Sequence, residues 1–287
     1  MPELPEVETV ARGVHQRVHG DRIVEVWVGR HPEPFKTPPA SMAKGLEGRA
    51  ILSVRRLGKH IVCELGTAAS NRTAPRRART PSPQPEAQWI VHLGMTGRLL
   101  VTTPDAPVAA HTHARLTLAG GRELRFVDPR RFGRLEWRDL HRSKPFTPPG
   151  AEPLEIDSEE FAALFRKRKL PVKAALLNQA LLSGVGNIYA DESLFRAGIR
   201  PRRSVGRLSR ADLERLRRAL GEVLRQAISL GGSSVSDYVD ANGVRGFFQL
   251  EHRVYQRTGE PCRVCGAPIQ RIVVGGRSTH YCPACQR

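Results

Sequence analysis

The chain of 287 residues lacks any run apolar enough to form a membrane-spanning helix. Its first residues also lack the apolar core of a secretory signal peptide. We therefore expect an intracellular, cytoplasmic protein that makes no membrane contact. Cysteine is scarce: there are five, and four of them form two close pairs near the C-terminus. That distribution argues against a disulfide framework and indicates metal ligation in a reducing compartment.

Acidic residues are also in short supply. The chain has 28 Asp and Glu residues and 46 Lys and Arg residues, which gives a formal net charge of +18 and a pI of about 10.8. The basic residues are spread along the whole length, with no single basic tail. This pattern favours a polyanion bound across an extended face, and nucleic acid is the partner we expect. The alternative is a protein that is merely basic and soluble.

The first residues carry the most specific chemistry. Removal of Met1 would leave Pro2 with a secondary amine whose reference pKa is about 8, so part of it is neutral and nucleophilic near pH 7. Such an amine forms a charged iminium with an aldehyde-level carbon, and the iminium withdraws electrons from adjacent bonds. Glu3 places a carboxyl beside it, where it could act as a general acid. The alternative is structural, because Pro5 and Glu6 also suit the first turn of a helix.

The first half of the chain has the pattern of an antiparallel β-structure. A leading helix is followed by many short apolar segments, and Gly120-Gly121 is a hairpin turn signal. One leading helix with so many strands predicts a β-sandwich. The expected strands are 23–28, 51–54, 61–65, 89–93, 99–101, 114–118, 124–127 and 133–137.

Residues 67–88 interrupt this pattern. They are rich in Ala, Arg, Pro, Ser and Thr and have almost no large apolar side chains. They cannot bury enough surface to order themselves, so we expect a flexible basic loop between two strands. Its arginines could touch DNA phosphates weakly, although a solvated loop is the simpler interpretation.

Beyond a proline-rich linker the period becomes helical. Asp157 or Ser158 caps a first helix, a second runs from Val172 to Leu182, and a tight turn at 183–187 leads into a third. Ser209 and Asp212 form a capping box that opens a long fourth helix. The turn at 183–187 could present backbone N–H groups to a phosphate, or it could be an ordinary helical corner. We therefore expect an N-terminal domain at 1–142, a linker at 143–154, a helical domain at 155–240 and a C-terminal domain at 241–287.

The C-terminal cysteines have metal-ligand spacing. Two C-x₂-C pairs are separated by a span typical of zinc sites, and we expect a β-hairpin between them that turns at Gly275-Gly276. Four thiolates complete a tetrahedral Zn²⁺ and leave no position for water, so the predicted zinc, one per chain, is structural. The predicted ligands are Cys262, Cys265, Cys282 and Cys285.

Five segments occur in an order that resembles formamidopyrimidine-DNA glycosylase, the bacterial 8-oxoguanine glycosylase and AP lyase. They are residues 1–9 (MPELPEVET), 92–95 (HLGM), 128–133 (DPRRFG), 184–190 (GVGNIYA) and the four-cysteine tail. The resemblance covers nearly the whole chain. It implies an α+β multidomain fold: an N-terminal β-sandwich with a leading helix, a helix–two-turn–helix domain and a C-terminal zinc-finger hairpin. It also implies a monomer that binds double-stranded DNA containing oxidised bases, in the bacterial cytoplasm at the nucleoid.

The resemblance assigns roles to four residues. Pro2 matches the nucleophile that attacks the sugar C1′ and forms a Schiff base, and Glu3 matches the acid that assists sugar opening. Lys59 matches a lysine near the DNA phosphates that serves as proton donor in β-elimination. Arg277 matches the finger arginine assigned to δ-elimination. The implied product is a one-nucleotide gap with phosphates at both ends.

A second set matches residues that contact DNA. Met95, Arg130 and Phe132 correspond to the trio that fills the space left by the flipped lesion, whose extrusion costs a few kcal/mol of unstacking. In the alternative, Met95 and Phe132 are core residues of strands. His111, Arg168 and Asn187 match DNA-contacting positions, and we add Lys173 as a candidate phosphate contact.

Three other functions deserve comparison. An endonuclease VIII-like glycosylase for oxidised pyrimidines would share Pro2, Glu3 and Lys59, but Leu4 and the trio argue against it. A non-catalytic DNA-binding protein would not need those three residues. A zinc-ribbon protein bound to ribosomal RNA would explain the charge but not the N-terminus.

Overall fold

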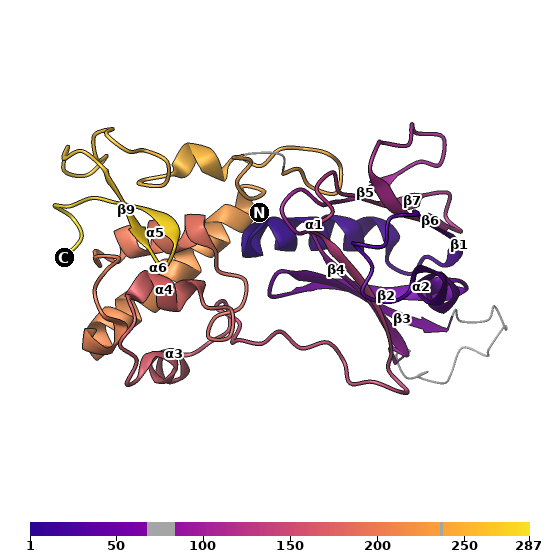
Figure 1. The fold of residues 1–287 in the computed structure, drawn as a ribbon, viewed down its shortest axis with the longest axis horizontal. Coiled ribbons are helices and arrows are strands. Elements are labelled where there is room, and N and C mark those ends of the chain that lie inside the picture. Colours follow the sequence, from indigo (N-terminus) through magenta and orange to yellow (C-terminus); the bar gives the residue numbers. More distant parts are fainter. Residues whose placement is uncertain (68–83, 236–237) are drawn as a thin grey trace, which may run out of the picture. The chain divides into compact units, whose positions relative to one another are not determined.

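The computed structural model describes residues 1–67, 84–235 and 238–287 (Figure 1). The chain divides into two compact units. Unit 1 contains residues 1–2 and 6–147 with the described part of 236–245, and unit 2 contains 3–5, 148–235 and 246–287. The loop predicted at 67–88 lies mostly outside the described residues. Its two ends belong to strands, because β3 (His60–Thr67) ends at Thr67 and β4 (Ala87–His92) begins at Ala87.

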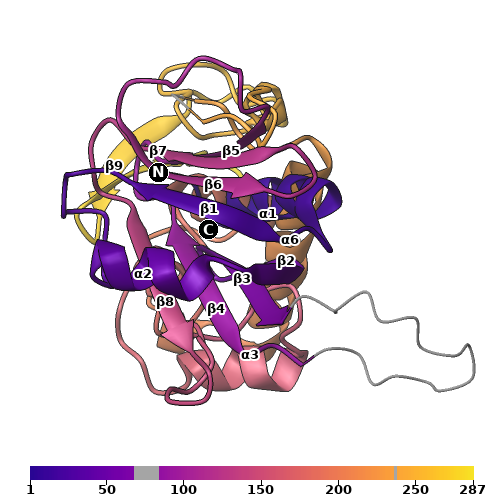
Figure 2. The same ribbon diagram turned by 90° about the vertical axis from the view of Figure 1, so that its right-hand side faces the viewer.

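Unit 1 contains two four-stranded antiparallel sheets, which Figure 2 shows as separate layers. One sheet has the order β1 (Ile23–Val28), β6 (Thr112–Leu118), β7 (Glu123–Val127), β5 (Arg98–Thr102). The other has the order β2 (Arg49–Leu57), β3, β4, β8 (Arg134–Asp139). Alternate residues of both sheets enter one apolar core, as the period of two requires. The predicted β-sandwich is confirmed.

Two helices accompany the sheets. Helix α1 (Leu4–Val18) places Val7, Val10, Val14 and Val18 in the same core, so the helical spacing of these valines reflects burial. Helix α2 (Pro39–Leu46) was not expected from the sequence. A proline in its first turn starts it and two buried side chains, Met42 and Leu46, anchor it.

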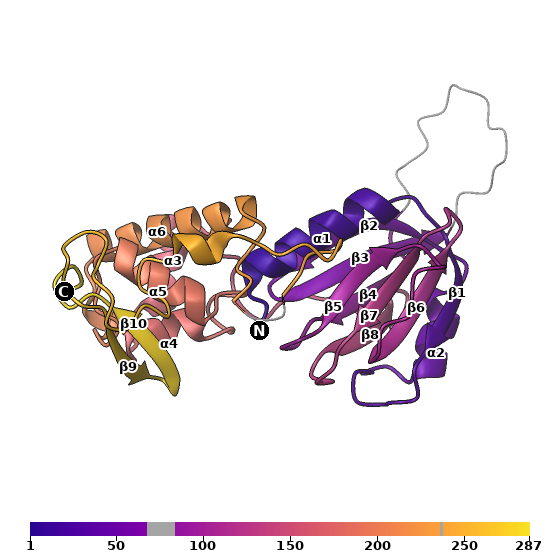
Figure 3. The ribbon, with the colours of Figure 1, turned by 90° about the horizontal axis from the view of Figure 1, so that it is seen from above.

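Unit 2 is mainly helical around a second apolar core. Its long helix α6 begins with the predicted capping box, in which Ser209 accepts from the Asp212 N–H and the Asp212 side chain accepts from the Ser209 N–H. The β9–β10 hairpin lies beside α5, and Figure 3 shows it next to α4 as well. The elements are α3 (Ser158–Phe165), α4 (Val172–Leu177), α5 (Asn187–Arg196), η1 (Val205–Arg207), α6 (Arg210–Ser229), η2 (Phe248–Glu251), β9 (Gln270–Val274) and β10 (Arg277–Tyr281).

One predicted helix was too long. The second helix was expected to reach Leu182, but α4 ends at Leu177. The Asn178 side chain accepts a hydrogen bond from the Ala180 N–H at 3.0 Å, which diverts the backbone from the helix. The Gln179 side chain then bonds Gly184 and Val185 and closes the following turn. No helix within the described ranges combines the length and apolarity needed to cross a membrane.

Candidate active site and metal centre

The carboxylate of Glu3 lies at the N-terminus of helix α5. Its oxygens face the backbone N–H groups of Ile188 at 3.2 Å and Tyr189 at 3.5 Å, and the side chain is buried. These are among the N–H groups that a helix leaves without an internal partner, and the helix dipole stabilises negative charge there. A Cβ at Gly186 would lie 2.1 Å from the Glu3 carboxyl carbon. Only glycine at 186 therefore permits this arrangement.

A second contact fixes the same turn. The Leu4 N–H donates to the Gly184 carbonyl at 3.0 Å, and Gly184 has a φ of +90°, which glycine adopts at little cost. Residues 3–4 and 184–188 are thus held together by the Glu3 carboxylate and by the Leu4–Gly184 backbone hydrogen bond. Pro2, immediately before Glu3, is buried.

Lys59 lies in the turn between β2 and β3 and is only 8% exposed. The turn is tied to helix α1 through Arg56, whose Nε donates to Glu8 at 2.8 Å while Nη1 donates to the Gly58 carbonyl at 3.2 Å. Gly58 has a φ of +59°, the left-handed conformation that such a tight turn needs. Arg56, which the sequence did not single out, thus sets the position of the turn that carries Lys59.

Two loops of unit 1 interlock around buried Asp128. Its carboxylate accepts from the Gly133 N–H at 2.7 Å and from the Thr96 hydroxyl at 2.6 Å, and it therefore holds loop 128–133 against loop 94–97. Phe132 is 50% exposed and Met95 is 40% exposed, so neither is a core residue. The interpretation of both as core residues of strands is wrong.

Arg130 and His111 are also exposed on unit 1. The Arg130 guanidinium lies 4.9 Å from the Phe132 ring centroid, a cation–π distance that keeps the two side chains together. His111 has a φ of 64°, and its carbonyl accepts from the Asp128 N–H at 3.0 Å. Asp128 therefore fixes both loops and the segment that carries His111.

The strand β10, which begins at Arg277, is anchored on α4 and α5. The carbonyl of Ser278 accepts from Asn187 Nδ2 at 3.0 Å and from Lys173 Nζ at 2.8 Å. Arg277 itself is exposed directly after the Gly275-Gly276 turn. Two side chains thus hold the backbone immediately after Arg277.

Lys173 does not occupy the surface position that a phosphate contact requires. Its side chain has no exposed area, and Nζ lies 2.7 Å from an Asp191 carboxylate oxygen and 2.9 Å from the Thr279 hydroxyl. Burial lowers the pKa of Lys173, and the Asp191 carboxylate opposes that shift. This placement does not fit the predicted phosphate contact, because the N–H donors of the ammonium group already bond to buried protein atoms.

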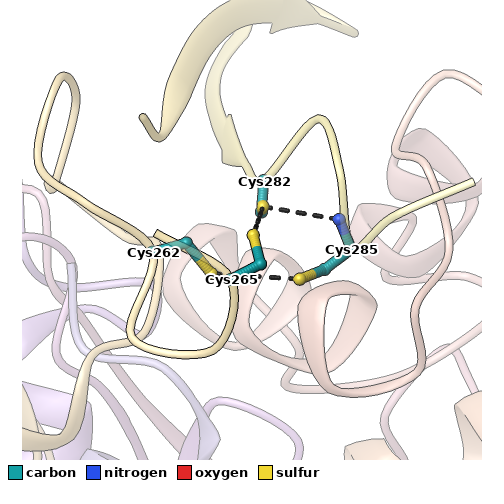
Figure 4. Close-up of side chains that lie close together, drawn as sticks. All are labelled: Cys262, Cys265, Cys282 and Cys285. Carbon is teal, nitrogen blue, oxygen red and sulfur yellow. Dashed lines mark hydrogen bonds between the residues drawn. The ribbon is translucent and has the colours of Figure 1, made fainter. Parts of the chain in front are cut away.

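The four C-terminal sulfurs converge on one point (Figure 4). All lie within 4.8 Å of one another, with 3.4 Å between Cys265 and Cys282 and 3.9 Å between Cys262 and Cys285. Four sulfurs at about 2.3 Å from one Zn²⁺ in a tetrahedron would be about 3.8 Å apart, so the set fits the ion. The N–H groups of Val264 and Cys285 each point to a cysteine sulfur at 3.4 Å. These residues form a structural zinc site of the Cys₄ type.

Three family models together match most of the chain. They are the formamidopyrimidine-DNA glycosylase N-terminal domain at residues 1–135, the H2TH domain of the same protein at 149–239, and the zinc finger found in FPG and IleRS at 259–287.

The chain belongs to the formamidopyrimidine-DNA glycosylase family.

Individual members of the family are similar over their whole length. The formamidopyrimidine-DNA glycosylase of Solibacter usitatus is 46% identical over 287 residues, and that of Thioalkalivibrio sulfidiphilus is 42% identical over 291, with 100% of each chain covered. A Lactococcus lactis FPG mutant, solved in complex with a Fapy-dG containing DNA, has a TM-score of 0.85 at 34% identity and 100% coverage of both chains. The wild-type Lactococcus lactis FPG with an oxidized pyrimidine containing DNA has a TM-score of 0.83 at 34% identity, again with 100% coverage of both chains.

Several further residues stabilise the site, although the sequence alone did not indicate them. Asp191 holds both Lys173 and the backbone of β10, through the His280 N–H at 2.9 Å. Its neighbour Glu192 is buried and accepts from three successive backbone N–H groups at 253–255. Burial raises the pKa of Glu192, and those three donors counteract the shift. Side chains of this kind leave no sequence signal, because their partners are distant in the chain.

Tyr255 is a further residue near Glu3. Burial raises the pKa of Tyr255, and the carboxylates of Glu3 and Asp191 act in the same direction. Arg168, by contrast, is exposed at the end of α3, where its Nε donates to the Leu164 carbonyl at 2.7 Å. The Arg168 side chain therefore folds back on α3 at the surface of unit 2.

Proposed function

We propose that this chain is a bifunctional DNA glycosylase and AP lyase of base excision repair. It removes oxidised purines, 8-oxoguanine and formamidopyrimidines, from double-stranded DNA and then cuts the strand. The observation that carries the proposal is full-length membership of the family together with a Pro2-Glu3 opening whose carboxylate is held on helix α5.

Pro2 is the nucleophile. Once Met1 is removed, the secondary amine attacks C1′ of the damaged nucleotide while the bond from C1′ to the base breaks and the base leaves with a proton. Opening of the sugar ring then gives an iminium between the proline nitrogen and C1′. Part of the amine is neutral near pH 7 without any burial, because its reference pKa is about 8.

Glu3 assists the opening of the sugar, because its carboxyl can deliver a proton to the ring oxygen. The iminium then acidifies the C2′ proton, whose loss expels the 3′ phosphate in β-elimination. Lys59 is the proton donor of this step. Loss of the C4′ proton next expels the 5′ phosphate, and Arg277 serves this δ-elimination. The product is a one-nucleotide gap with phosphates at both ends.

The exposed side chains of unit 1 hold the DNA open. Met95 and Phe132 enter the stack as apolar wedges where the lesion has left, and Arg130 donates to the orphaned cytosine. His111, Asn187 and Arg168 contact the backbone. Lys173 is not assigned a phosphate, because its ammonium supports β10 from the interior.

The zinc holds the finger that carries Arg277. When bound, it supplies a cross-link between the two cysteine pairs and no reactive position. The family relatives are bacterial and the proposed substrate is genomic DNA, so we place the protein in the cytoplasm at the nucleoid, as a monomer.

The test is borohydride trapping on two matched duplexes, one with 8-oxoguanine opposite cytosine and one with an oxidised pyrimidine. Borohydride reduces the iminium to a stable amine and so links protein to DNA. We expect an adduct on the purine duplex that is lost in Pro2→Gly. The matched control keeps Pro2 but carries an uncleaved N-terminal tag, which converts the amine to an amide and should give no adduct.

The remaining outcomes decide between the alternatives. An adduct on the pyrimidine duplex alone would assign the chain to oxidised pyrimidines, a lesion class found with the wild-type Lactococcus lactis FPG. No adduct on either duplex, with Met1 removed and zinc bound, would leave a DNA-binding protein without this chemistry.

A further inference from the structure

Unit 2 contains a basic hollow of which the proposed function uses only Arg168. It has a volume of about 510 Å³ and lies between the turn after α3 and the 3₁₀ helix η1. Four of its six lining residues are cations and none is acidic. The lining residues are Lys167, Arg168, Lys169, Ser204, Gly206 and Arg207.

The four cations differ from their neighbours in lacking acidic partners. On the adjacent helix α6, Arg215 pairs with Asp212 at 2.7 Å, and Arg217 and Arg218 pair with Glu214 at 2.8 and 3.0 Å. Within the described residues, no ion pair involves the four cations of the hollow, and all four are exposed. Like charges repel, so four cations around one hollow favour a bound anion.

The hollow is also rigidly built. The Val205 N–H donates to the Leu170 carbonyl at 3.0 Å, and the Ser204 hydroxyl lies 3.4 Å from the Lys169 carbonyl. A Cβ at Gly206 would lie 2.4 Å from the Arg168 carbonyl oxygen, so the two turns approach as closely as glycine allows. A preformed cluster binds an anion without the cost of ordering its backbone.

We infer that this hollow is an accessory phosphate site that binds the DNA backbone beyond the nucleotides engaged by the catalytic residues. Lys167, Lys169 and Arg207 join Arg168 in this site. The inference rests on the proposed function, because DNA is the polyanion that function supplies. An acidic protein segment is the weaker alternative, since protein interfaces place apolar and aromatic side chains at their centre and the lining has none.

The expected contribution is to affinity and its salt dependence, not to catalysis. Each phosphate neutralised by a basic side chain releases condensed counterions, so the logarithm of the binding constant falls with the logarithm of salt with a slope of about −0.9 per contact. When salt rises fourfold, the binding constant of a variant that lacks one phosphate contact should therefore fall about 3.5-fold less than that of the wild type.

The experiment compares two triple variants that remove the same charge. The pocket variant is Lys167→Gln, Lys169→Gln and Arg207→Gln, and the matched control is Arg215→Gln, Arg217→Gln and Arg218→Gln on α6. Affinity for an undamaged duplex and a lesion duplex is measured across a graded potassium chloride series. Thermal unfolding establishes that both variants are folded. We expect the pocket variant alone to lose about 0.9 in slope, with an unchanged excision rate at saturating enzyme.

A shortened duplex locates the phosphate. Duplexes are shortened from one end or from the other. On the duplex that lacks the phosphate bound by the hollow, the salt slope of the wild type should fall to that of the pocket variant. Equal slopes for the pocket and control variants would overturn the site, as would a difference that survives trimming on both sides. If the pocket variant keeps the wild-type salt slope on DNA but no longer binds immobilised poly-glutamate, the hollow would be assigned to an acidic protein instead. Failure of the wild type to excise any base would refute the proposed function alone, because the slope on undamaged DNA does not depend on excision.

Discussion

The carboxylate of Glu3 and the backbone N–H of Ile188 are hydrogen-bonded at 3.2 Å although 185 positions separate them in the chain. This contact ties the Glu3 carboxylate to the first turn of α5. It places a negative group where the helix dipole favours one, and it does so only because residue 186 has no side chain.

Gly186→Ala should therefore impair catalysis while leaving the fold intact. The added Cβ would lie 2.1 Å from the Glu3 carboxyl carbon, so Glu3 must move. A displacement of about 1 Å in an aligned group costs roughly 10²-fold in rate, and we expect a loss of that order in single-turnover release of 8-oxoguanine. The matched control is Gly29→Ala, whose Cβ would meet only ordinary contacts at 3.4 Å. A Gly186→Ala enzyme as fast as the control would contradict the proposed role of Glu3.

Arg56→Lys should slow the proposed strand cleavage more than the proposed base release. Lysine cannot bond both Glu8 and the Gly58 carbonyl as the guanidinium does, so the turn bearing Lys59 loosens. We expect strand cleavage to slow about tenfold more than base release, with unfolding free energy reduced by about 1–3 kcal/mol. Base release and strand cleavage are measured separately on one lesion duplex. Arg55→Lys, at a position whose side chain is 49% exposed and pairs with Glu64, is the control. Equal slowing of both steps would remove Arg56 from this role.

Phe132→Ala should leave stability nearly unchanged while reducing lesion excision. Because the side chain is 50% exposed, we expect a change in unfolding free energy within about 0.5 kcal/mol. The flipped nucleotide would lose its wedge, so excision from a paired lesion should fall by about tenfold or more, and cleavage at a preformed abasic site should fall less. Phe126→Ala is the contrast, since that ring is fully buried and its loss should cost about 3–5 kcal/mol of stability. A comparable stability loss in Phe132→Ala would show that the ring belongs to the core.

His60→Phe should reduce acid destabilisation of unit 1. Burial is the main cause that lowers the pKa of His60 to about 4 and of His92 to about 4, and the two rings lie 4.8 Å apart. The unfolded pKa is near 6.5, so the unfolded chain binds more protons between pH 6.5 and 4. Stability contributed by neutral His60 is therefore present above pH 6.5 and is lost as the pH falls toward 4.

The expected difference is up to about 3 kcal/mol between pH 7 and pH 4, seen as a smaller loss of unfolding free energy in the variant. Phenylalanine keeps the ring contact with Phe146, whose centroid lies 4.6 Å from that of His60. Since the His60 charge also depresses the pKa of His92, an NMR titration of the variant should show the His92 pKa moving upward. An unchanged acid transition together with an unmoved His92 titration would contradict this account.

Local sequence signals predicted the elements whose causes are local. The capping box of Ser209 and Asp212, the Gly275-Gly276 turn and the valine stripe of α1 each depend on residues a few positions apart. The four cysteines were recognisable because metal geometry restricts their spacing, and their sulfurs converge as expected. The second helix was predicted too long because the Asn178 side chain competes with the helix for a backbone N–H.

The sequence by itself determined the fold class, the zinc ligands and the chemical identity of the N-terminus, because each rests on periodicity or on short spacing. Only the tertiary structure decided that Lys173 is an internal support, that Arg56 fixes the Lys59 turn and that Glu3 rests on α5. The physical reason is that the bonds of Lys173 to Ser278, of Arg56 to Glu8 and of Glu3 to Ile188 each join residues that are distant in the sequence and meet only in the folded chain. A buried ion pair or a helix cap made by a distant residue has no periodicity, so it becomes visible only when burial and distance are known.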